Sequence, residues 1–157
     1  MSTQTARATV WKSIVVDAPI ERAFSVFTED MTSWWPPEHH IIEAELAEMV
    51  FEPRAGGDVY DRGVDGSECR WGRVLAYDPP HRVVFSWHIN PHWRLETDPD
   101  RTSEVEVRFT AEGPDRTRVE LEHRHLERHG EGWSAMRDAV DSPDGWGLTL
   151  RRLAERL

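Results

Sequence analysis

The feature that most constrains the fold is the pattern of residues 132–157 at the end of the chain. Large apolar side chains recur there at intervals of three and four, with arginine and glutamate between them, which predicts an amphipathic helix. The apolar stripe consists of Trp133, Met136, Val140, Trp146, Leu150, Leu153 and Leu157. A helix of this kind needs an apolar surface to cover, and we expect a sheet to supply that surface.

The sequence Asp-Ser-Pro-Asp-Gly at 141–145 interrupts this period and predicts two helical pieces. We expect a short piece over 133–140 and the main helix over 143–157. Ser142 can accept hydrogen bonds from the free N–H groups at the start of the main helix, and Pro143 suits its first position, where no N–H is needed. If the break lies at one end of a cavity, it can act as a gate.

Almost all of the chain before this stretch has the pattern of strands joined by short turns. Apolar and β-branched residues predict strands at 9–16, 47–51, 58–62, 68–77, 82–89, 103–112 and 117–125. In the last two, apolar positions alternate with Glu and Arg, which is typical of an antiparallel meander with one buried face and one wet face. Two short helices, near 20–27 and 29–35, follow the first strand. The order predicts an α+β fold in which helices cover one face of an antiparallel sheet.

The length of 157 residues favours one domain, which we place at 9–157 after a polar and disordered N-terminal segment, 1–8. The net charge of −10 argues against binding to nucleic acid or to an anionic membrane surface. No apolar run is long enough to span a bilayer, and no signal core precedes the first strand. With a single cysteine, Cys69, which we read as an inert structural thiol, we expect a cytoplasmic protein.

Eight tryptophans in a chain of this size require large core volumes or a cavity that they line. Trp34 and Trp35 are adjacent on a predicted helix, so one is expected to pack in the core and the other to point to the mouth of a pocket. Trp71, Trp87 and Trp146 lie on sheet and helix faces that should meet inside. Core filling is the simpler interpretation of each ring, and a ligand-lining role is the alternative.

Two histidines, His123 and His125, continue an inward apolar stripe on the last predicted strand. A His-x-His pair on one strand face can bind a metal, but no third ligand follows at a recognisable spacing, and His39 and His40 could supply one only through tertiary proximity. We therefore expect no metal. If the cavity carries out chemistry, His123 and His125 are the natural acid–base groups at neutral pH.

Three local motifs, in this order, carry a resemblance to a known superfamily. Residues 27–36 read FTEDMTSWWP, residues 71–87 form a hairpin segment containing Gly-Arg-Val and Pro-Pro-His-Arg-Val-Val-Phe-Ser-Trp, and Gly145-Trp146 opens a leucine-bearing helix. Together they resemble bacterial members of the START-like, or SRPBCC, superfamily, in the branch of activator of heat-shock protein 90 ATPase C-terminal domain-like proteins. The resemblance covers about residues 9–157.

The resemblance implies a helix-grip (Bet v-type) fold: a curved antiparallel sheet wrapped around a long C-terminal helix, with two short helices after strand 1 and a cavity between sheet and helix. Family members bind small apolar or aromatic molecules in that cavity, and some are polyketide cyclases or aromatases. The co-chaperones that give the branch its name carry a further N-terminal domain, for which 157 residues leave no room.

We therefore favour a binding module for a small hydrophobic or aromatic molecule over an enzyme. The residues expected to contact the ligand are Trp35, Trp71, Trp87, His123, His125, Met136 and Trp146. A cofactor-free cyclase or dehydratase that uses the same cavity is the first alternative, and a co-chaperone-like interaction module is the second. No nucleophile elbow, phosphate loop or dinucleotide fingerprint is present, so we expect no cofactor. A homodimer is left open.

Overall fold

The computed structural model describes residues 8–36, 39 and 41–157. The predicted disordered segment, 1–8, therefore lies outside the described residues except for its last position, and so does His40. No helix in these ranges is long and apolar enough to span a membrane.

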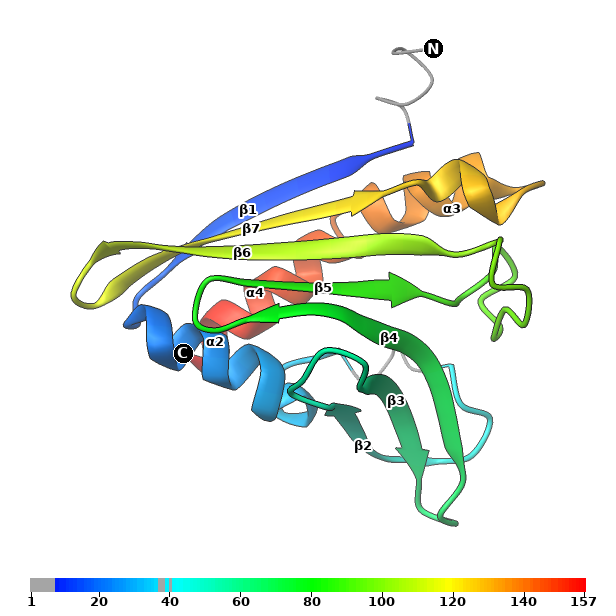
Figure 1. Ribbon diagram of the computed structural model, residues 1–157, viewed down its shortest axis with the longest axis horizontal. Coiled ribbons are helices and arrows are strands. Elements are labelled where there is room, and N and C mark those ends of the chain that lie inside the picture. Colours follow the sequence, from blue (N-terminus) through cyan, green and yellow to red (C-terminus); the bar gives the residue numbers. More distant parts are fainter. Residues whose placement is uncertain (1–7, 37–38, 40) are drawn as a thin grey trace.

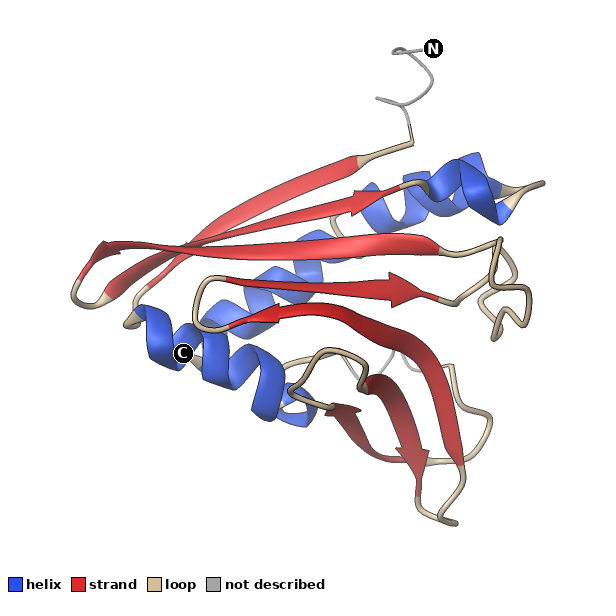
Figure 2. Cartoon of the chain, viewed as in Figure 1, coloured by secondary structure: helices blue, strands red, loops and turns tan. Residues whose placement is uncertain are grey.

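The described chain forms one seven-stranded antiparallel sheet, which confirms the predicted meander (Figures 1 and 2). Its strands are β1 (Val10–Val16), β2 (Leu46–Phe51), β3 (Asp58–Gly63), β4 (Glu68–Asp78), β5 (Arg82–Trp87), β6 (Ser103–Gly113) and β7 (Arg116–Arg124). The spatial order is β1-β7-β6-β5-β4-β3-β2, so that each strand from β2 to β6 pairs with the next one in sequence, and β1 forms the edge of the sheet beside β7. The sheet is strongly curved, because β4 bends between its pairing with β3 and its pairing with β5 (Figure 1).

Gly72 lies at this bend, where the register between β3 and β4 shifts. A Cβ at this position would lie 2.9 Å from the carbonyl oxygen of Ser86 on β5, closer than ordinary contacts allow. The absence of a side chain at Gly72 thus lets three strands approach one another where the sheet turns. The curvature produces the concave face on which the core is built.

The concave face of β6 and β7 follows the predicted alternation. Across the two strands, Phe109 pairs with Val119, Val107 with Leu121 and Val105 with His123, and all six side chains are buried. Helix α2 (Ile20–Glu29) buries Ala23, Phe24, Val26 and Phe27 against this layer. The second predicted short helix is a single 3₁₀ turn, η1 (Met31–Ser33).

The C-terminal stretch forms a bent helix in two pieces, α3 (Trp133–Asp141) and α4 (Trp146–Arg156), after the 3₁₀ turn η3 (Leu126–His129). The expected start of the main helix at Ser142 and Pro143 is wrong. The Ser142 hydroxyl donates to the carbonyl oxygen of Ala139, so Ser142 ends α3 and does not cap α4. Residues 143–145 form a turn, and α4 begins at Trp146.

Gly145 lies directly against the end of α3. A Cβ there would collide with the carbonyl oxygens of Ala139 and Val140, so only glycine allows the two helical pieces to pack this closely. This tight packing argues against the predicted gate at the break. Instead, the break fixes Trp146 at the first position of α4, next to the last residues of α3.

Candidate ligand cavity

A cavity of about 350 Å³ lies between the end of β5, the segment after η1 and the α3–α4 break. This volume is at the lower end of the range of small-molecule sites. Four tryptophans belong to its wall: Trp35, Trp87, Trp93 and Trp146. Aliphatic surface comes from Ile41, Ile89, Ala139 and Val140, and the side chains with polar atoms are His39, Ser142, Asp144 and Thr149. The wall is therefore mainly aromatic and apolar.

Three of these tryptophans and Trp71 form a closed cluster of rings. The centroid distances are 5.7 Å for Trp35–Trp71, 5.4 Å for Trp71–Trp87, 5.5 Å for Trp87–Trp146 and 5.6 Å for Trp35–Trp146. Planes within these pairs are inclined by 38–86°, as aromatic quadrupoles prefer. Because each ring packs against two others, the cluster holds the wall in one arrangement.

A buried chain of hydrogen bonds supports Trp146 from behind. The indole Nε1–H donates to Nδ1 of His123 at 3.1 Å, and Nε2 of His123 lies 2.8 Å from the hydroxyl oxygen of Ser103. That hydroxyl lies 2.7 Å from Nε2 of His129 on η3. An indole N–H can only donate, so Nδ1 of neutral His123 accepts from Trp146 and its protonated Nε2 donates to the Ser103 hydroxyl.

Both histidines of this chain are held neutral. Burial and, to a smaller extent, the neighbouring His129 lower the pKa of His123 to about 3. Burial also lowers the pKa of His129, to about 4. This row of hydrogen-bonded side chains therefore orients Trp146 without any charged group at neutral pH.

Asp61 fixes a second part of the wall. Its carboxylate is fully buried and accepts hydrogen bonds from Trp71 Nε1 at 3.0 Å and from the backbone N–H groups of Ile41 and Ile42 at 2.9 and 3.3 Å. Asp61 thereby ties Trp71 to the segment that places Ile41 at the cavity. No local pattern predicts this role, because Asp61 lies in an otherwise ordinary short strand.

Of the seven residues predicted to contact a ligand, Trp35, Trp87 and Trp146 lie in the cavity wall. Trp34 packs in the core with its indole N–H bonded to the carbonyl oxygen of Val26, whereas Trp35, which is also buried, borders the cavity. Trp71 and Met136 are buried and lie outside the wall.

The expectation that His123 and His125 both face the cavity is wrong. His123 is fully buried behind Trp146 and Trp87, and Trp146 and Ser103 occupy its two nitrogens, so it can neither reach the cavity nor bind a metal. His125 follows β7 with a φ of 65°, in the left-handed region, so the strand alternation ends one residue before it. Its side chain is about one-third exposed and lies near Glu127.

Other residues of the site were not predicted. Trp93 reaches the wall from the loop after β5 and has a φ of 62°, and His39 and Asp144 supply its ionisable groups. Ser103 and His129 lie 20 and 26 residues from the histidine and serine they contact, so no local pattern joins them. Among the described residues, no three His, Cys, Asp or Glu side chains are placed to hold a metal ion. Burial raises the pKa of the Cys69 thiol to about 11, which agrees with an inert thiol.

Comparisons with known proteins agree with this architecture. The family model for Activator of Hsp90 ATPase homolog 1-like protein matches residues 17–157. A comparison with curated protein sequences gives no match.

Several solved structures are similar along nearly the whole chain. The anthrahydroquino-γ-pyrone synthase Txn09 is 45% identical, with a TM-score of 0.68, and the match covers 95% of this chain and 96% of that one. The self-sacrificing resistance protein CalC from Micromonospora echinospora is 30% identical, with a TM-score of 0.67 and coverage of 96% and 94%. Protein NE0264 from Nitrosomonas europaea, at 17% identity, a TM-score of 0.68 and coverage of 96% and 94%, shares the fold.

Proposed function

The chain belongs to the family of Activator of Hsp90 ATPase homolog 1-like proteins, and on this premise we propose that its cavity binds a small, flat aromatic molecule. The observation that carries the proposal is the wall itself: Trp35, Trp87, Trp93 and Trp146 border a cavity of about 350 Å³. Indole faces at fixed inclinations favour flat ligands through offset stacking and edge contacts. The tight ring cluster provides this surface without rearrangement, which favours affinity.

A titration of the protein with tricyclic and single-ring aromatic compounds, followed by tryptophan fluorescence and by calorimetry, tests this function. We expect tricyclic compounds to bind with micromolar or better affinity and single rings about tenfold more weakly, since affinity grows with the apolar area removed from water. Ala139→Trp, which places a large side chain in the wall, should abolish binding. Ala135→Trp, at an exposed position of the same helix outside the cavity wall, is the matched control for added bulk. If no aromatic compound binds, the proposal fails.

A second candidate is cofactor-free cyclisation or dehydration of the bound molecule. It is favoured by the 45% identity to a synthase over 95% of this chain. The ionisable side chains among the described wall residues are His39 and Asp144, so these, and not His123, would transfer protons. His39→Ala and Asp144→Asn should then lower turnover of a polyketide-type substrate at least a hundredfold and leave ligand affinity within about threefold. Unchanged turnover in both variants would exclude this mechanism.

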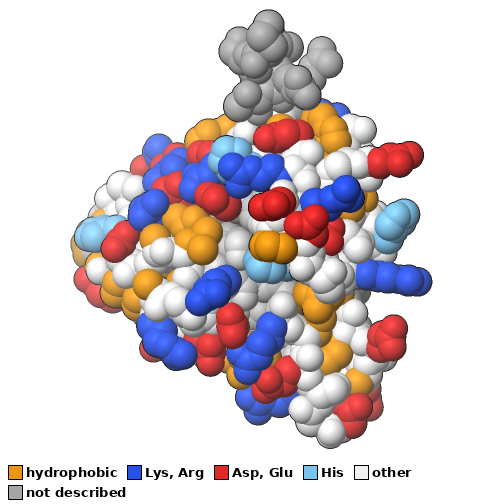
Figure 3. Space-filling view, turned by 45° about the vertical axis from the view of Figure 1, so that its right-hand side comes forward, with side chains coloured by type: hydrophobic (Ala, Val, Ile, Leu, Met, Phe, Trp, Pro, Cys, Tyr) orange, Lys and Arg blue, Asp and Glu red, His pale blue; other side chains and the backbone are white. Residues whose placement is uncertain are grey.

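A co-chaperone-like role in binding another protein, which the family description suggests, has less support than ligand binding. Interaction surfaces are usually contiguous apolar patches. The face in Figure 3 instead carries charged side chains of both signs, and its hydrophobic side chains form small separate patches. Exposed large apolar side chains lie apart in the chain: Trp11 is on β1, Val64 in the turn after β3 and Leu75 on β4.

A further inference from the structure

The residues that line the cavity differ in their exposure to solvent. Trp35, Trp87 and Trp146 are 4%, 5% and 3% exposed and form its inner part. Trp93, on the loop after β5, is 42% exposed, and Asp144, in the turn before α4, is also exposed, so these two residues lie at its opening. A bound molecule therefore meets closely packed rings inside, and an indole and a carboxylate where the cavity meets solvent.

The carboxylate of Asp144 differs from those of its acidic neighbours along the chain. The carboxylate of Asp138 lies 2.8 Å from the guanidinium of Arg137, and that of Asp141 lies 2.8 Å from the ammonium group of Lys12. Asp144 forms no ion pair with any residue that the structure describes. The acidic side chain at the opening is thus the one of these three whose charge is not balanced by a neighbouring cation of the described chain.

The indole of Trp93 differs in the same way from the other two indoles that are not buried. Trp11 is 56% exposed, and the guanidinium carbon of Arg108 lies 5.4 Å from its ring centroid. The guanidinium carbon of Arg137 lies at the same distance from the ring centroid of Trp133. Within the described part of the chain, the ring of Trp93 contacts neither a cation nor another aromatic ring. An indole attracts a cation more strongly than any other aromatic side chain does.

We propose that the cavity selects an organic cation: an aromatic molecule that carries a protonated amine or a quaternary ammonium group, which the indole ring of Trp93 and the carboxylate of Asp144 hold at the opening. This inference rests on the proposed binding function and adds the charge of the ligand. Because the opening is next to solvent, the cationic group keeps part of its hydration and avoids the cost of burying a charge. The aromatic part of the molecule enters the inner, apolar part of the cavity.

The rest of the wall favours the same sign of charge. No arginine or lysine lies among the described wall residues, so an anionic ligand would find no positively charged partner there. Arg151, on α4, donates to the carbonyl oxygen of Pro143 at 3.2 Å and is not part of the wall. The net charge of the chain, −10, also attracts cations and repels anions.

The test compares three bicyclic probes of similar shape: the cation N-methylquinolinium, its neutral isostere 1-methylnaphthalene, and the anion 1-naphthoate. Affinities are measured by equilibrium dialysis with the full chain at pH 8, where histidine side chains are ordinarily neutral. We expect the cation to bind about tenfold more tightly than the neutral probe, through a cation–π contact and an ion pair, and the anion to bind most weakly. If the neutral probe or the anion binds as tightly as the cation, the inference is overturned and the binding function stands. If no probe binds, both fail.

Variants locate the effect. Asp144→Asn removes the charge and keeps the size of the side chain, and Trp93→Leu removes the indole ring. Each should lower the preference for the cation over the neutral probe about threefold. Asp138→Asn and Trp11→Leu are the matched controls, because both residues are exposed and lie outside the wall, and the preference should be unchanged in them. A preference that survives in both Asp144→Asn and Trp93→Leu contradicts the assignment.

A measurement on the unaltered protein does not depend on whether the variants fold. Because Asp144 is exposed, its attraction for a cation is screened by salt. Raising the ionic strength to about 1 M should therefore lower the preference for N-methylquinolinium over 1-methylnaphthalene about twofold or more. A preference that is independent of salt would overturn the inference.

Discussion

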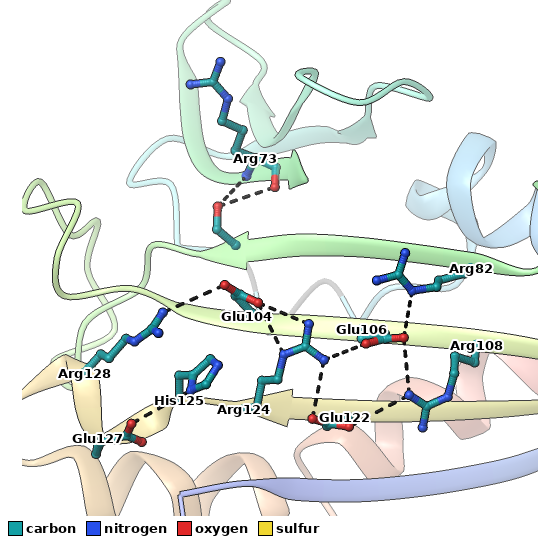
Figure 4. A network of polar contacts seen from close by, with 11 residues as sticks. Arg73, Arg82, Glu104, Glu106, Arg108, Glu122, Arg124, His125, Glu127 and Arg128 are labelled. Atoms are coloured by element: carbon teal, nitrogen blue, oxygen red, sulfur yellow. Dashed lines mark hydrogen bonds and ion pairs between the residues drawn. The ribbon is translucent and has the colours of Figure 1, made fainter. Parts of the chain in front are cut away.

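The two faces of β6 and β7 differ although they alternate along the same strands. The concave face presents Val105, Val107 and His123 to a neutral, aromatic interior. The convex face presents Glu and Arg side chains that form a network across β5, β6 and β7 (Figure 4). One strand pair therefore serves two environments, because successive side chains point to opposite faces.

Glu106 is the centre of the convex network. Its carboxylate lies 2.6 Å from Arg124, 2.9 Å from Arg82 and 3.3 Å from Arg108 (Figure 4). Burial alone would raise the pKa of Glu106, but hydrogen bonds from Arg124 and Arg82 outweigh it and lower the pKa to about 2. Behind the concave face, the two buried histidines of the Trp146 hydrogen-bond chain are instead kept neutral. The comparison shows that the charged side chains of β6 and β7 are gathered on the face next to solvent, whereas His123 on the other face is neutral.

Acidification should lower the stability of the protein first through the two buried histidines, His123 and His129. The pKa values of His123 and His129 in the folded protein, about 3 and about 4, are below the ordinary value of 6.5. Between pH 6.5 and the pKa values of the folded protein, the unfolded chain binds more protons than the folded protein. The stabilising contribution of the neutral histidines is therefore fully present above pH 6.5 and is lost as the pH falls towards 4. The free energy of unfolding should fall by up to about 1.4 kcal/mol per pH unit for each histidine.

Urea unfolding between pH 7 and pH 4.5 measures this slope. Burial also lowers the pKa of His88, so the informative quantity is the difference between the protein and its His129→Gln variant. That variant should have a shallower slope, by about one proton. Glu106 contributes only below its ordinary pKa of 4.5, outside the measured range. An identical slope in the variant would show that His129 is not held neutral by the fold.

Removing the side chain of His123, which supports Trp146 from behind, should be more destabilising than a substitution on the convex face. His123→Ala leaves Trp146 Nε1 without its acceptor, removes one of the two histidine partners of the Ser103 hydroxyl and opens space in the core. We expect a loss of about 3 kcal/mol in unfolding free energy. Glu122→Ala, the neighbouring position on the convex face, is the matched control and should cost less than about 1 kcal/mol. Thermal and urea unfolding measure both. Similar losses in the two variants would contradict the contrast between the faces.

The sequence predicted the fold well because the fold depends on local periodicity. Alternation of apolar and charged residues defined β6 and β7, and spacings of three and four defined α2, α3 and α4. The break in the C-terminal helix was also predicted, but the role of Ser142 at the break was not. A serine there can either end the first helical piece or start the second, and the close approach of Gly145 to the end of α3 favours the first role.

The site was predicted only where residue type alone suffices. Trp35, Trp87 and Trp146 were found because large rings are expected near a cavity. His125 was placed wrongly because strand alternation was extended one residue beyond the point at which the backbone turns into the left-handed region. The partners of His123 were missed because they come from β6, η3 and α4, and only tertiary structure brings these elements together.

A substitution in the charged network of the convex face should have a small effect. Glu106→Gln keeps the shape and one acceptor oxygen but removes the charge that three arginines surround, so we expect a loss of about 1 kcal/mol at low salt. Because this face is near solvent, raising the ionic strength to about 1 M should reduce that loss, whereas the loss in His123→Ala should not change. Urea unfolding at two salt concentrations measures both. Ligand affinity should be unaltered in Glu106→Gln, since its side chain lies on the opposite face from the cavity; a change in affinity would mean that the two faces are coupled through the strands they share.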